Sequence, residues 1–260
     1  MDTIDKSRVF GIDDYYLNTF DAAATKAFGA SFVSHKAGQG TPEIGLGVDP
    51  LFKARIQQTR DVGLVDNAYW LFDPRGSVQE QADLFLSQMD GKFGLIPPCI
   101  DAETPVANMT DAEYWACAHA GRISLGGFIA DVELGIHQEC ILYSSPGFLT
   151  LILSGASAQE LAWWALRVRW LAEYKVAQPK PPFSFGWDFW QASEAADGGP
   201  LGQVDCNYFN GTAEQFEVLY GTPTPAPAPT PAPVIVQPEM IRLTGDYDDG
   251  SSKILYQKGG

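Results

Sequence analysis

Two acidic residues two positions apart, Asp101 and Glu103, follow an apolar run at residues 95–100. If that run is a β-strand, both carboxyl groups lie on one face, with their Cβ atoms about 6–7 Å apart. Carboxyl groups that close beside an apolar core repel, so one tends to stay protonated while the other stays ionised. Glycosidic bond cleavage uses such a pair, because one group protonates the leaving oxygen and the other stabilises a cationic centre. Acidic residues at strand ends also cap helices or remain solvated, and the pair alone does not decide between these roles.

A second acidic cluster, Asp13 and Asp14, follows the apolar run at residues 9–12. In α/β barrels the reacting groups collect at the C-terminal ends of the parallel strands. We therefore expect Asp13 to lie near Asp101 and Glu103 if both runs belong to one barrel.

Aromatic residues are plentiful near the same predicted strand ends, where their ring faces could stack on the C–H surfaces of a sugar. Each of them could equally pack in the core, so the set is more informative than any one member. The residues that we predict to bind a substrate are Tyr69, Trp70, Tyr143, Trp170, Tyr174 and Trp190.

The elements that would position these residues alternate between strand-like and helix-like segments over residues 1–221. Strands are predicted at residues 8–13, 31–37, 65–72, 94–103 and 139–144. Helices are predicted between them, and several begin with a capping box, a hydroxyl side chain three residues before Glu or Gln. These boxes begin at Ser77, Thr110, Ser157 and Thr212. Such alternation is typical of a parallel sheet with helical crossovers.

Three further strands are predicted at residues 166–174, 183–191 and 203–209, with short connections rich in Pro or Gly. Parallel neighbours need connections of about a dozen residues or more, so these last strands are predicted to run partly antiparallel. Five β/α units followed by three strands predict an α/β fold, an irregular TIM-like (β/α)5(β)3 barrel.

Residues 222–238 are predicted to be a linker, because their repeated TPTPAPAPTPAP sequence favours an extended, semi-rigid chain. Residues 239–260 form a short C-terminal tail with two alternating runs on either side of Asp248-Asp249-Gly250. This pattern indicates a β-hairpin as one candidate structure. So short a tail cannot bury a core of its own, and we expect it to dock on another component, oligomerise or stay loose.

The composition argues against several classes of partner. The 32 acidic and 17 basic residues give a net charge of -15, which disfavours nucleic acid, whose binding requires clustered Lys and Arg. The longest uncharged window, residues 140–159, is interrupted by Ser, Gly and Pro, so no membrane insertion is predicted. The first residues carry neither a basic segment nor an apolar one, and no secretory signal is expected.

No sequence motif for a metal or a cofactor is present, and we predict neither. His35, His119 and His137 are scattered and form no HExxH motif, and glycine-rich nucleotide-binding motifs are missing. The cysteines are far apart without a CxxC pair, which predicts buried free thiols rather than a metal cage. They are Cys99, Cys117, Cys140 and Cys206.

A series of short segments then follows one order along residues 8–211. They are Gly11-Ile12-Asp13, FVSHKAGQGT at 32–41, AYWLFDP at 68–74, IDAE at 100–103, ILYS at 141–144, WLAEY at 170–174, Trp190-Gln191 and VDCN at 204–207. In this order they resemble the "GID", "KATEGT", "YHF", "DxE", "iYs", "WiAxY", "WQ" and "vDxN" segments of the glycoside hydrolase family 25 lysozymes, the Chalaropsis-type muramidases.

The resemblance implies hydrolysis of the β-1,4 bond between N-acetylmuramic acid and N-acetylglucosamine in peptidoglycan glycan strands. By position, Glu103 would be the general acid and Asp101 would support the reaction centre. Asp13 and Asp205 match the remaining acidic positions, and only the resemblance places Asp205 in the site. Direct attack by a carboxylate and participation of the substrate's 2-acetamido group both stay open. No cofactor is implied.

The sequence departs from the family pattern at Gln39, where the family has Glu, and at Trp70, where it has His. These departures keep open an alternative, a non-catalytic glycan-binding or structural barrel of a virion. With no secretory signal expected, the favoured hypothesis is a phage or prophage endolysin that waits in the host cytoplasm before release to the wall, or a virion-associated lytic protein. Its tail could dock on another protein or on a wall component.

Overall fold

The computed structural model describes residues 2–89, 94–103, 111–221, 240–246 and 252–258, with backbone alone at 111–121 and in the last two ranges. Its contacts divide the chain into two units, Met1–Gly221 and Thr222–Gly260. The first unit contains the described helices, the barrel and the predicted site residues.

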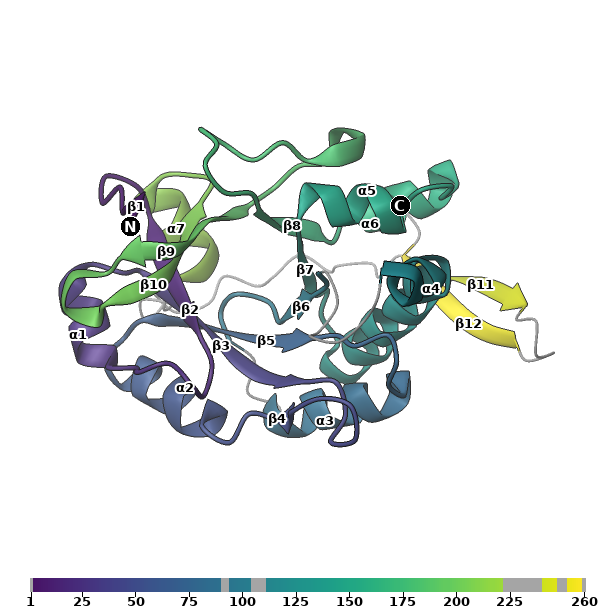
Figure 1. Ribbon diagram of the computed structural model, residues 1–260, viewed down its shortest axis with the longest axis horizontal. Helices are drawn as coiled ribbons and strands as arrows, with labels where there is room; N and C mark the ends of the chain where they lie inside the picture. Colours follow the sequence, from purple (N-terminus) through teal and green to yellow (C-terminus); the bar gives the residue numbers. More distant parts are fainter. Residues whose placement is uncertain (1, 90–93, 104–110, 222–239, 247–251, 259–260) are drawn as a thin grey trace, which may run out of the picture. The chain divides into compact units, whose positions relative to one another are not determined.

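Eight strands of the first unit close into a barrel, in the order in which they follow one another along the chain (Figure 1). They are β2 (Phe10–Asp14), β3 (Phe32–Gln39), β5 (Val65–Leu71), β6 (Cys99–Asp101), β7 (Ile141–Ser144), β8 (Val168–Ala172), β9 (Phe189–Asp197) and β10 (Gln203–Phe209). The barrel closes where β10 pairs with β2. Two short strands pair at the edges of the barrel strands: β1 (Asp2–Thr3) lies beside β9, and β4 (Gly47–Val48) lies beside β3.

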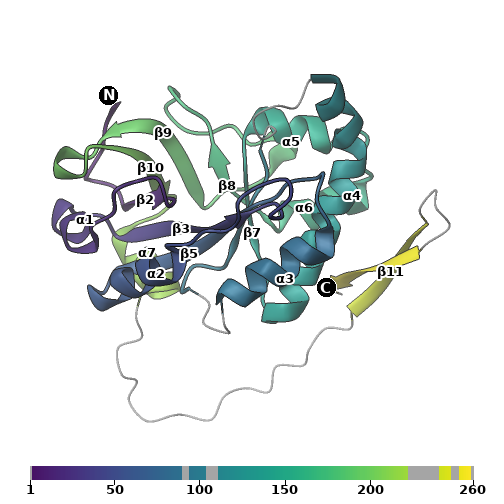
Figure 2. The same ribbon diagram turned by 60° about the horizontal axis from the view of Figure 1, so that its bottom comes forward.

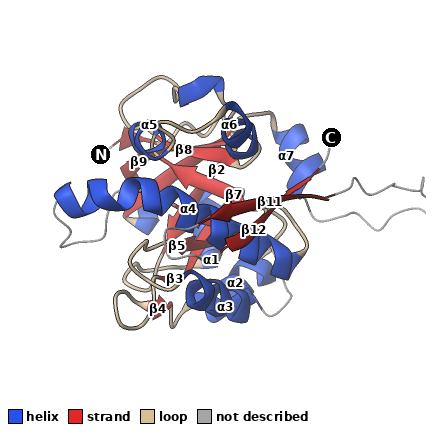
Figure 3. Ribbon diagram, turned by 90° about the vertical axis from the view of Figure 1, so that its right-hand side faces the viewer, coloured by secondary structure: helices blue, strands red, loops and turns tan. Residues whose placement is uncertain are grey.

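Helical crossovers connect the first six barrel strands and lie outside the barrel (Figures 2 and 3). They contain α1 (Ala22–Phe28), α2 (Phe52–Asp61), α3 (Val78–Met89), α4 (Asp111–Ile136), α5 (Pro146–Ile152) and α6 (Ala158–Ala165). The strands from β2 to β9 are parallel neighbours, and β10 is antiparallel to both β9 and β2. Helix α7 (Ala213–Tyr220) follows β10. The predicted fold class, an irregular α/β barrel, is confirmed.

The predicted strand at residues 183–191 begins too early, and this changes the direction of one pairing. Strand β9 begins at Phe189, and Pro182–Ser184 form a 3-10 turn before it. The connection from Ala172 is therefore long enough for β8 and β9 to run parallel. Among the eight barrel strands of the described structure, only β10 is antiparallel to its neighbours, because a short turn with a 3-10 segment at Gly199–Leu201 joins it to β9.

Strand β6 is also shorter than the predicted strand at 94–103. It begins at Cys99, directly after Pro97 and Pro98, which have no N–H to donate to a neighbouring strand. Its three residues are buried and pair with β5 on one side and β7 on the other. Asp101 therefore stands at the last position of a central strand.

Capping boxes begin helices where predicted, at Ser157 for α6 and at Thr212 for α7. At the start of α3 the hydroxyl of Ser77 accepts from the N–H of Glu80 at 3.2 Å. The box predicted at Thr110 lies outside the described residues. Each hydroxyl satisfies an N–H that has no partner within its helix.

The barrel interior is apolar at one end, where aromatic side chains fill it. Phe32 and Phe189 occupy the first positions of β3 and β9, with ring centroids 5.4 Å apart. Trp170 stacks on Phe189 at 4.7 Å, and Phe209 packs beside them at 5.5 Å from Phe189. A second apolar cluster lies between the outer faces of the strands and the helices, and includes Trp70. The polar residues of the interior are therefore confined to the opposite end.

The second unit contains a two-stranded antiparallel ribbon, β11 (Met240–Asp246) and β12 (Ser252–Lys258). Its strands cover the two runs from which a hairpin is predicted, while the predicted turn at 248–250 and the linker at 222–238 lie outside the described residues. A single two-stranded ribbon is marginally stable in water without further packing. We retain as a proposal the division into a barrel, a linker and a tail.

Three cysteines of the described part, Cys99, Cys140 and Cys206, are buried free thiols. The side chain of the fourth, Cys117, lies outside the described residues. No helix in the described ranges is both long and apolar enough to cross a bilayer.

Deletion of residues 222–260 is expected to leave the unfolding temperature of the barrel unchanged, because residues 1–221 contain the closed sheet and its core. Differential scanning calorimetry of the full and shortened chains measures this. A fall of about 4 °C or more, equivalent to about 1 kcal/mol or more for a domain of this size, would show that the barrel depends on the tail.

Candidate active site

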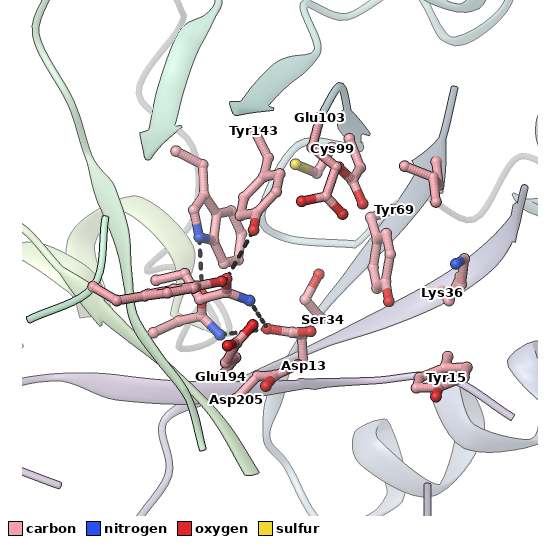
Figure 4. Close-up of a pocket in the computed structure, with 16 residues that line it drawn as sticks. Asp13, Tyr15, Ser34, Lys36, Tyr69, Cys99, Glu103, Tyr143, Glu194 and Asp205 are labelled. Atoms are coloured by element: carbon pink, nitrogen blue, oxygen red, sulfur yellow. Dashed lines mark hydrogen bonds between the residues drawn. The ribbon is translucent and has the colours of Figure 1, made fainter. Parts of the chain in front are cut away.

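A cavity of about 230 Å³ opens at the C-terminal ends of the parallel barrel strands (Figure 4). Five carboxyl groups and one ammonium group line it, together with four tyrosines and the floor residue Trp170. The charged residues are Asp13, Lys36, Asp101, Glu103, Glu194 and Asp205. The structure thus brings together all four acidic residues that the sequence analysis selects.

Strand alternation explains which side chains enter this cavity. Asp13 on β2 and Tyr69 on β5 point inward, while their neighbours Asp14 and Trp70 point outward toward the helices. At the end of β6, Asp101 and Glu103 lie two positions apart and both line the cavity, as predicted.

Asp13 lies opposite Asp205 in the antiparallel pairing of β2 with β10, and their carboxyl groups share a hydrogen bond. The Oδ2 atom of Asp13 also accepts from Asn207 Nδ2 at 2.7 Å and from Gln191 Nε2 at 3.0 Å. Burial raises the pKa of Asp13, and these three hydrogen bonds oppose that rise. Burial, followed by the charge of Asp13, raises the pKa of Asp205 to about 9. At neutral pH Asp205 therefore holds a proton.

Asp101 is 7% exposed, and its Oδ1 atom is buried without a hydrogen-bond partner in the described part of the chain. Burial raises the pKa of Asp101 well above its usual range, the charge of Glu103 adds to the rise, and Lys36 opposes it. Glu103 stands at the mouth of the cavity, where the residue is exposed to solvent while its carboxyl group faces the other acids. Desolvation of that group, followed by the charge of Asp13, raises the pKa of Glu103. The four acids therefore do not all ionise at neutral pH.

Lys36 is the cation among the cavity-lining residues of the described chain. Its Nζ donates to Gln39 Oε1 at 2.8 Å, because an irregularity in β3 between Lys36 and Gly38 returns Gln39 to the same face. Burial lowers the pKa of Lys36, while the charges of Asp101 and Glu103 oppose that shift. In return, the ammonium group lowers the pKa of both acids.

Four of the six aromatic residues predicted to bind a substrate line the cavity, and two do not. Tyr69, Tyr143 and Tyr174 line the cavity walls. Trp170 is 2% exposed and forms the floor, where its Nε1 donates to Asn207 Oδ1 at 3.0 Å. Its face is stacked on Phe189, so it supports the site from below.

Trp70 and Trp190 do not line the cavity, and the prediction that they contact substrate is corrected here. Trp70 is 0% exposed and packs against Phe85 under the helices, with ring centroids 5.6 Å apart. Trp190 is 4% exposed, packs on Tyr208 and donates through Nε1 to the backbone oxygen of Glu173 at 2.8 Å. Each follows or precedes an inward-facing residue, Tyr69 or Gln191, so alternation turns it outward.

Several cavity residues escaped the sequence analysis. Gln191 and Asn207 lie within the "WQ" and "vDxN" segments, and that spacing was the available signal for them. Glu194 follows the strand predicted at residues 183–191, at a position without a distinctive pattern. Lys36 lies in the segment recognised by resemblance, but a single lysine in a strand gave no functional signal.

The described residues contain no group of three or more His, Cys, Asp or Glu side chains arranged to hold a metal ion. His35 is buried behind the site, where its ring nitrogens contact Asp14 at 2.6 Å and Thr59 at 2.7 Å. His137 lies just beyond the end of α4, and the side chain of His119 lies outside the described residues. The cavity itself is lined by carboxyl, hydroxyl, amide and ammonium groups and by the thiol of Cys99.

Glycoside hydrolases are among the enzymes that use an α/β barrel with clustered carboxyl groups at the C-terminal ends of its strands. Comparison with known families places the chain within that class. The sequence model described as "Glycosyl hydrolases family 25" matches residues 11–198, and the chain belongs to this family.

Individual relatives agree with this assignment. "Uncharacterized protein YegX" of Escherichia coli K12 is 32% identical over 171 residues, which are 65% of this chain and 57% of YegX, so the match spans little more than half of that relative. "Lysozyme M1" of Streptomyces globisporus is 27% identical over 226 residues, 83% of this chain and 72% of that protein. The crystal structure of the bacterial lysozyme of Streptomyces coelicolor shares the fold, with a TM-score of 0.66 at 24% identity over 84% of this chain and 99% of that one.

Replacement of Trp70 by Ala is expected to lower the free energy of unfolding by about 3–5 kcal/mol, because it empties a fully buried site. Urea unfolding measures this loss. Leu134→Ala, at a position of α4 that is 60% exposed, is the control and should change stability by less than about 0.5 kcal/mol. A Trp70→Ala variant with unchanged stability but weaker glycan binding would instead show that Trp70 contacts the glycan.

Proposed function

We propose that this protein is a peptidoglycan hydrolase that cleaves the β-1,4 bond between N-acetylmuramic acid and N-acetylglucosamine, a lysozyme of the muramidase type. The observation that carries the proposal is the cavity in which Asp101 and Glu103 lie together with raised pKa values. Membership of family 25 and the similarity to Lysozyme M1 support it. Peptidoglycan glycan strands are then the partner.

Glu103 is assigned as the general acid. It stands at the mouth of the cavity, where a bound glycan would pass, and its raised pKa keeps a larger fraction protonated near neutral pH than an ordinary glutamate would have. In the first step its proton moves to the bridging oxygen of the leaving sugar. The bond from that oxygen to C1 of N-acetylmuramic acid then breaks. Water later attacks C1, where it leaves a hydroxyl group, and its other proton returns to Glu103.

Asp101 is assigned to support the reaction centre. Its buried Oδ1 atom has no partner among the described residues and faces a cavity in which an amide N–H would satisfy it. A hydrogen bond from the 2-acetamido group of the substrate would favour the ionised form of Asp101 and hold the acetamido oxygen near C1. Direct attack on C1 by a carboxylate remains the second route.

Asp13 and Asp205 are assigned to hold charge and substrate on the opposite wall. Tyr69, Tyr143 and Tyr174 present ring faces and neutral hydroxyl groups, because burial raises the pKa of all three. The hydroxyl groups of Tyr143 and Tyr174 both donate to Gln191 Oε1, at 2.7 and 2.6 Å. Their rings are therefore fixed before a glycan binds.

The alternative is a barrel that binds glycan without cutting it. Two departures from the family pattern motivated it, but Trp70 lies in the core, so Gln39 is the departure that bears on the cavity. Release from the cytoplasm of a phage host, association with a virion, and docking of the tail on a wall component or another protein remain predictions beside the enzymatic proposal.

Glu103→Gln is expected to lower turnover by about 100- to 10,000-fold, because it removes the transferred proton while keeping the volume of the side chain. Purified peptidoglycan is digested with each protein, reduced with borohydride, and the fragments are identified by mass spectrometry. New reducing ends on N-acetylmuramic acid, lost in the variant, are the expected result.

New ends on N-acetylglucosamine would contradict the assigned bond but keep the enzyme class. A wild-type protein that sediments with the walls and creates no new ends would favour the glycan-binding barrel. Equal turnover in Glu103→Gln and wild type would contradict the assigned acid.

Lys36→Met should move the alkaline limb of the pH profile of kcat/KM to higher pH. The acid must be protonated, so activity falls as pH rises through the pKa of Glu103. Lys36 lowers that pKa, and its removal raises it. Lys53→Met, which removes a charge from the outside of α2, is the matched control with no expected shift. A limb that moves to lower pH would contradict the assignment of Glu103.

A further inference from the structure

Two buried amide side chains, Gln191 and Asn207, face Asp13 with their N–H groups. Gln191 is 6% exposed and Asn207 is 0% exposed, and both donate to the same oxygen, Oδ2 of Asp13. These contacts join residues separated by 178 and 194 positions in the sequence. An oxygen that accepts two such bonds is stabilised in its ionised form.

The orientation of each amide is fixed from behind by groups that donate hydrogen bonds. Trp170 Nε1, which has no acceptor capacity, donates to Asn207 Oδ1 at 3.0 Å. If the Asn207 amide were flipped, its NH2 group would face the indole N–H, and its oxygen would face Asp13. Both contacts would then be unfavourable, so the observed orientation is the one that satisfies every group.

Gln191 is held in the same way by two hydroxyl groups. Tyr143 and Tyr174 both donate to its Oε1, which leaves the NH2 group as the part that faces Asp13. Dashed lines in Figure 4 mark hydrogen bonds that end on Asp13, and the two amide donors belong to β9 and β10. Two independent chains of donors therefore end on one carboxylate.

We propose that Gln191 and Asn207 are positioning residues that keep Asp13 a hydrogen-bond acceptor and so place the single proton of the Asp13–Asp205 pair on Asp205. The two carboxyl groups face each other across β2 and β10 and share a hydrogen bond, which requires one proton between them. The two amide donors determine which of the two carboxyl groups carries that proton. Asp205 then donates a hydroxyl hydrogen to Asp13, and the pair carries one negative charge, on Asp13.

The charge on Asp13 affects Glu103, the general acid of the proposed function, and this consequence rests on that proposed function. The negative charge of Asp13 raises the pKa of Glu103, after desolvation. If Asp13 were neutral, the pKa of Glu103 would be lower, and a smaller fraction of Glu103 would be protonated at neutral pH. The other titratable groups that interact with the pair are Asp14 on β2, Lys36 on β3, Tyr69 on β5, Cys99 and Asp101 on β6, Tyr143 on β7, Tyr174 after β8, Glu194 on β9 and Cys206 on β10.

The test locates the proton directly, by 13C NMR titration of the full chain labelled at aspartate side-chain carboxyl carbons and without substrate. In wild type the Asp205 signal should titrate near pH 9 and the Asp13 signal at lower pH. Gln191→Met removes one donor to Asp13 and should raise its titration midpoint by about one pH unit, as expected for one lost hydrogen bond to a charged group.

Gln191→Glu is the second variant, because it keeps the acceptor for both tyrosine hydroxyl groups and so protects the packing of the wall. It replaces the N–H donor with a carboxyl group, whose charge beside Asp13 adds to the effect of the lost donor, so the midpoint of Asp13 should rise by more than in Gln191→Met. Gln57→Met, at an exposed position of α2, is the matched control and should leave both midpoints unchanged.

An Asp13 signal that titrates above Asp205 in wild type would overturn the proposal, and so would an unchanged Asp13 midpoint in both Gln191 variants. The alkaline limb of kcat/KM should move to lower pH in Gln191→Met, because a less charged Asp13 lowers the pKa of Glu103. Loss of packing alone would reduce kcat without moving that limb. A wild-type protein that cleaves no peptidoglycan would contradict the proposed function and leave the NMR test of the proton intact.

Discussion

Asp13 and Asp205 lie opposite each other where β10 closes the barrel against β2. Two carboxyl groups that share a hydrogen bond in a desolvated site cannot both be ionised. Closure of the sheet therefore requires that the pair holds one proton. Asp101 and Glu103 arrive at the same cavity from β6 and meet the same constraint. The polar groups of the site are arranged around this repulsion: amide donors on one wall, and the Lys36 ammonium on the other.

The apolar floor makes that repulsion strong. Phe32, Trp170 and Phe189 fill the barrel beneath the carboxyl groups and exclude water from that side. Desolvation is the largest cause of the raised pKa of Asp101 and of Glu103. The same aromatic packing that stabilises the closed sheet thus sets the acidity of the residues above it. Trp170 links the two roles, because its ring belongs to the core and its indole N–H orients Asn207.

Local pattern in the sequence was sufficient for the parts of the site that depend on one strand. Alternation placed Asp101 and Glu103 on one face, and the order of strands and helices predicted the barrel. The same alternation rule forbids Tyr69 and Trp70 from both facing the cavity, and applying it there would have excluded Trp70. Strand β9 was placed too early because the apolar residues before Phe189 resemble a strand, while the chain forms a 3-10 turn there.

Contacts between segments that are far apart in the sequence could not be predicted from local pattern. Asp205 was selected by resemblance alone, since its partner Asp13 lies on the first barrel strand and its own strand runs antiparallel. The two amides escaped notice because their role exists only after the barrel closes.

The departure at Gln39 shows how one uncharged side chain changes this balance. Gln39 accepts a hydrogen bond from Lys36 without neutralising it, so the whole ammonium charge continues to act on Asp101 and Glu103. A glutamate at this position, as in the family pattern, would form a charged pair with Lys36 and add a sixth carboxyl group to the cavity rim. Both effects would raise the pKa of the two acids further. The four acids selected by resemblance therefore lie in a field that is less negative by one charge than it would be with a glutamate at position 39. The proposed acid, Glu103, should titrate at lower pH than it would beside that glutamate.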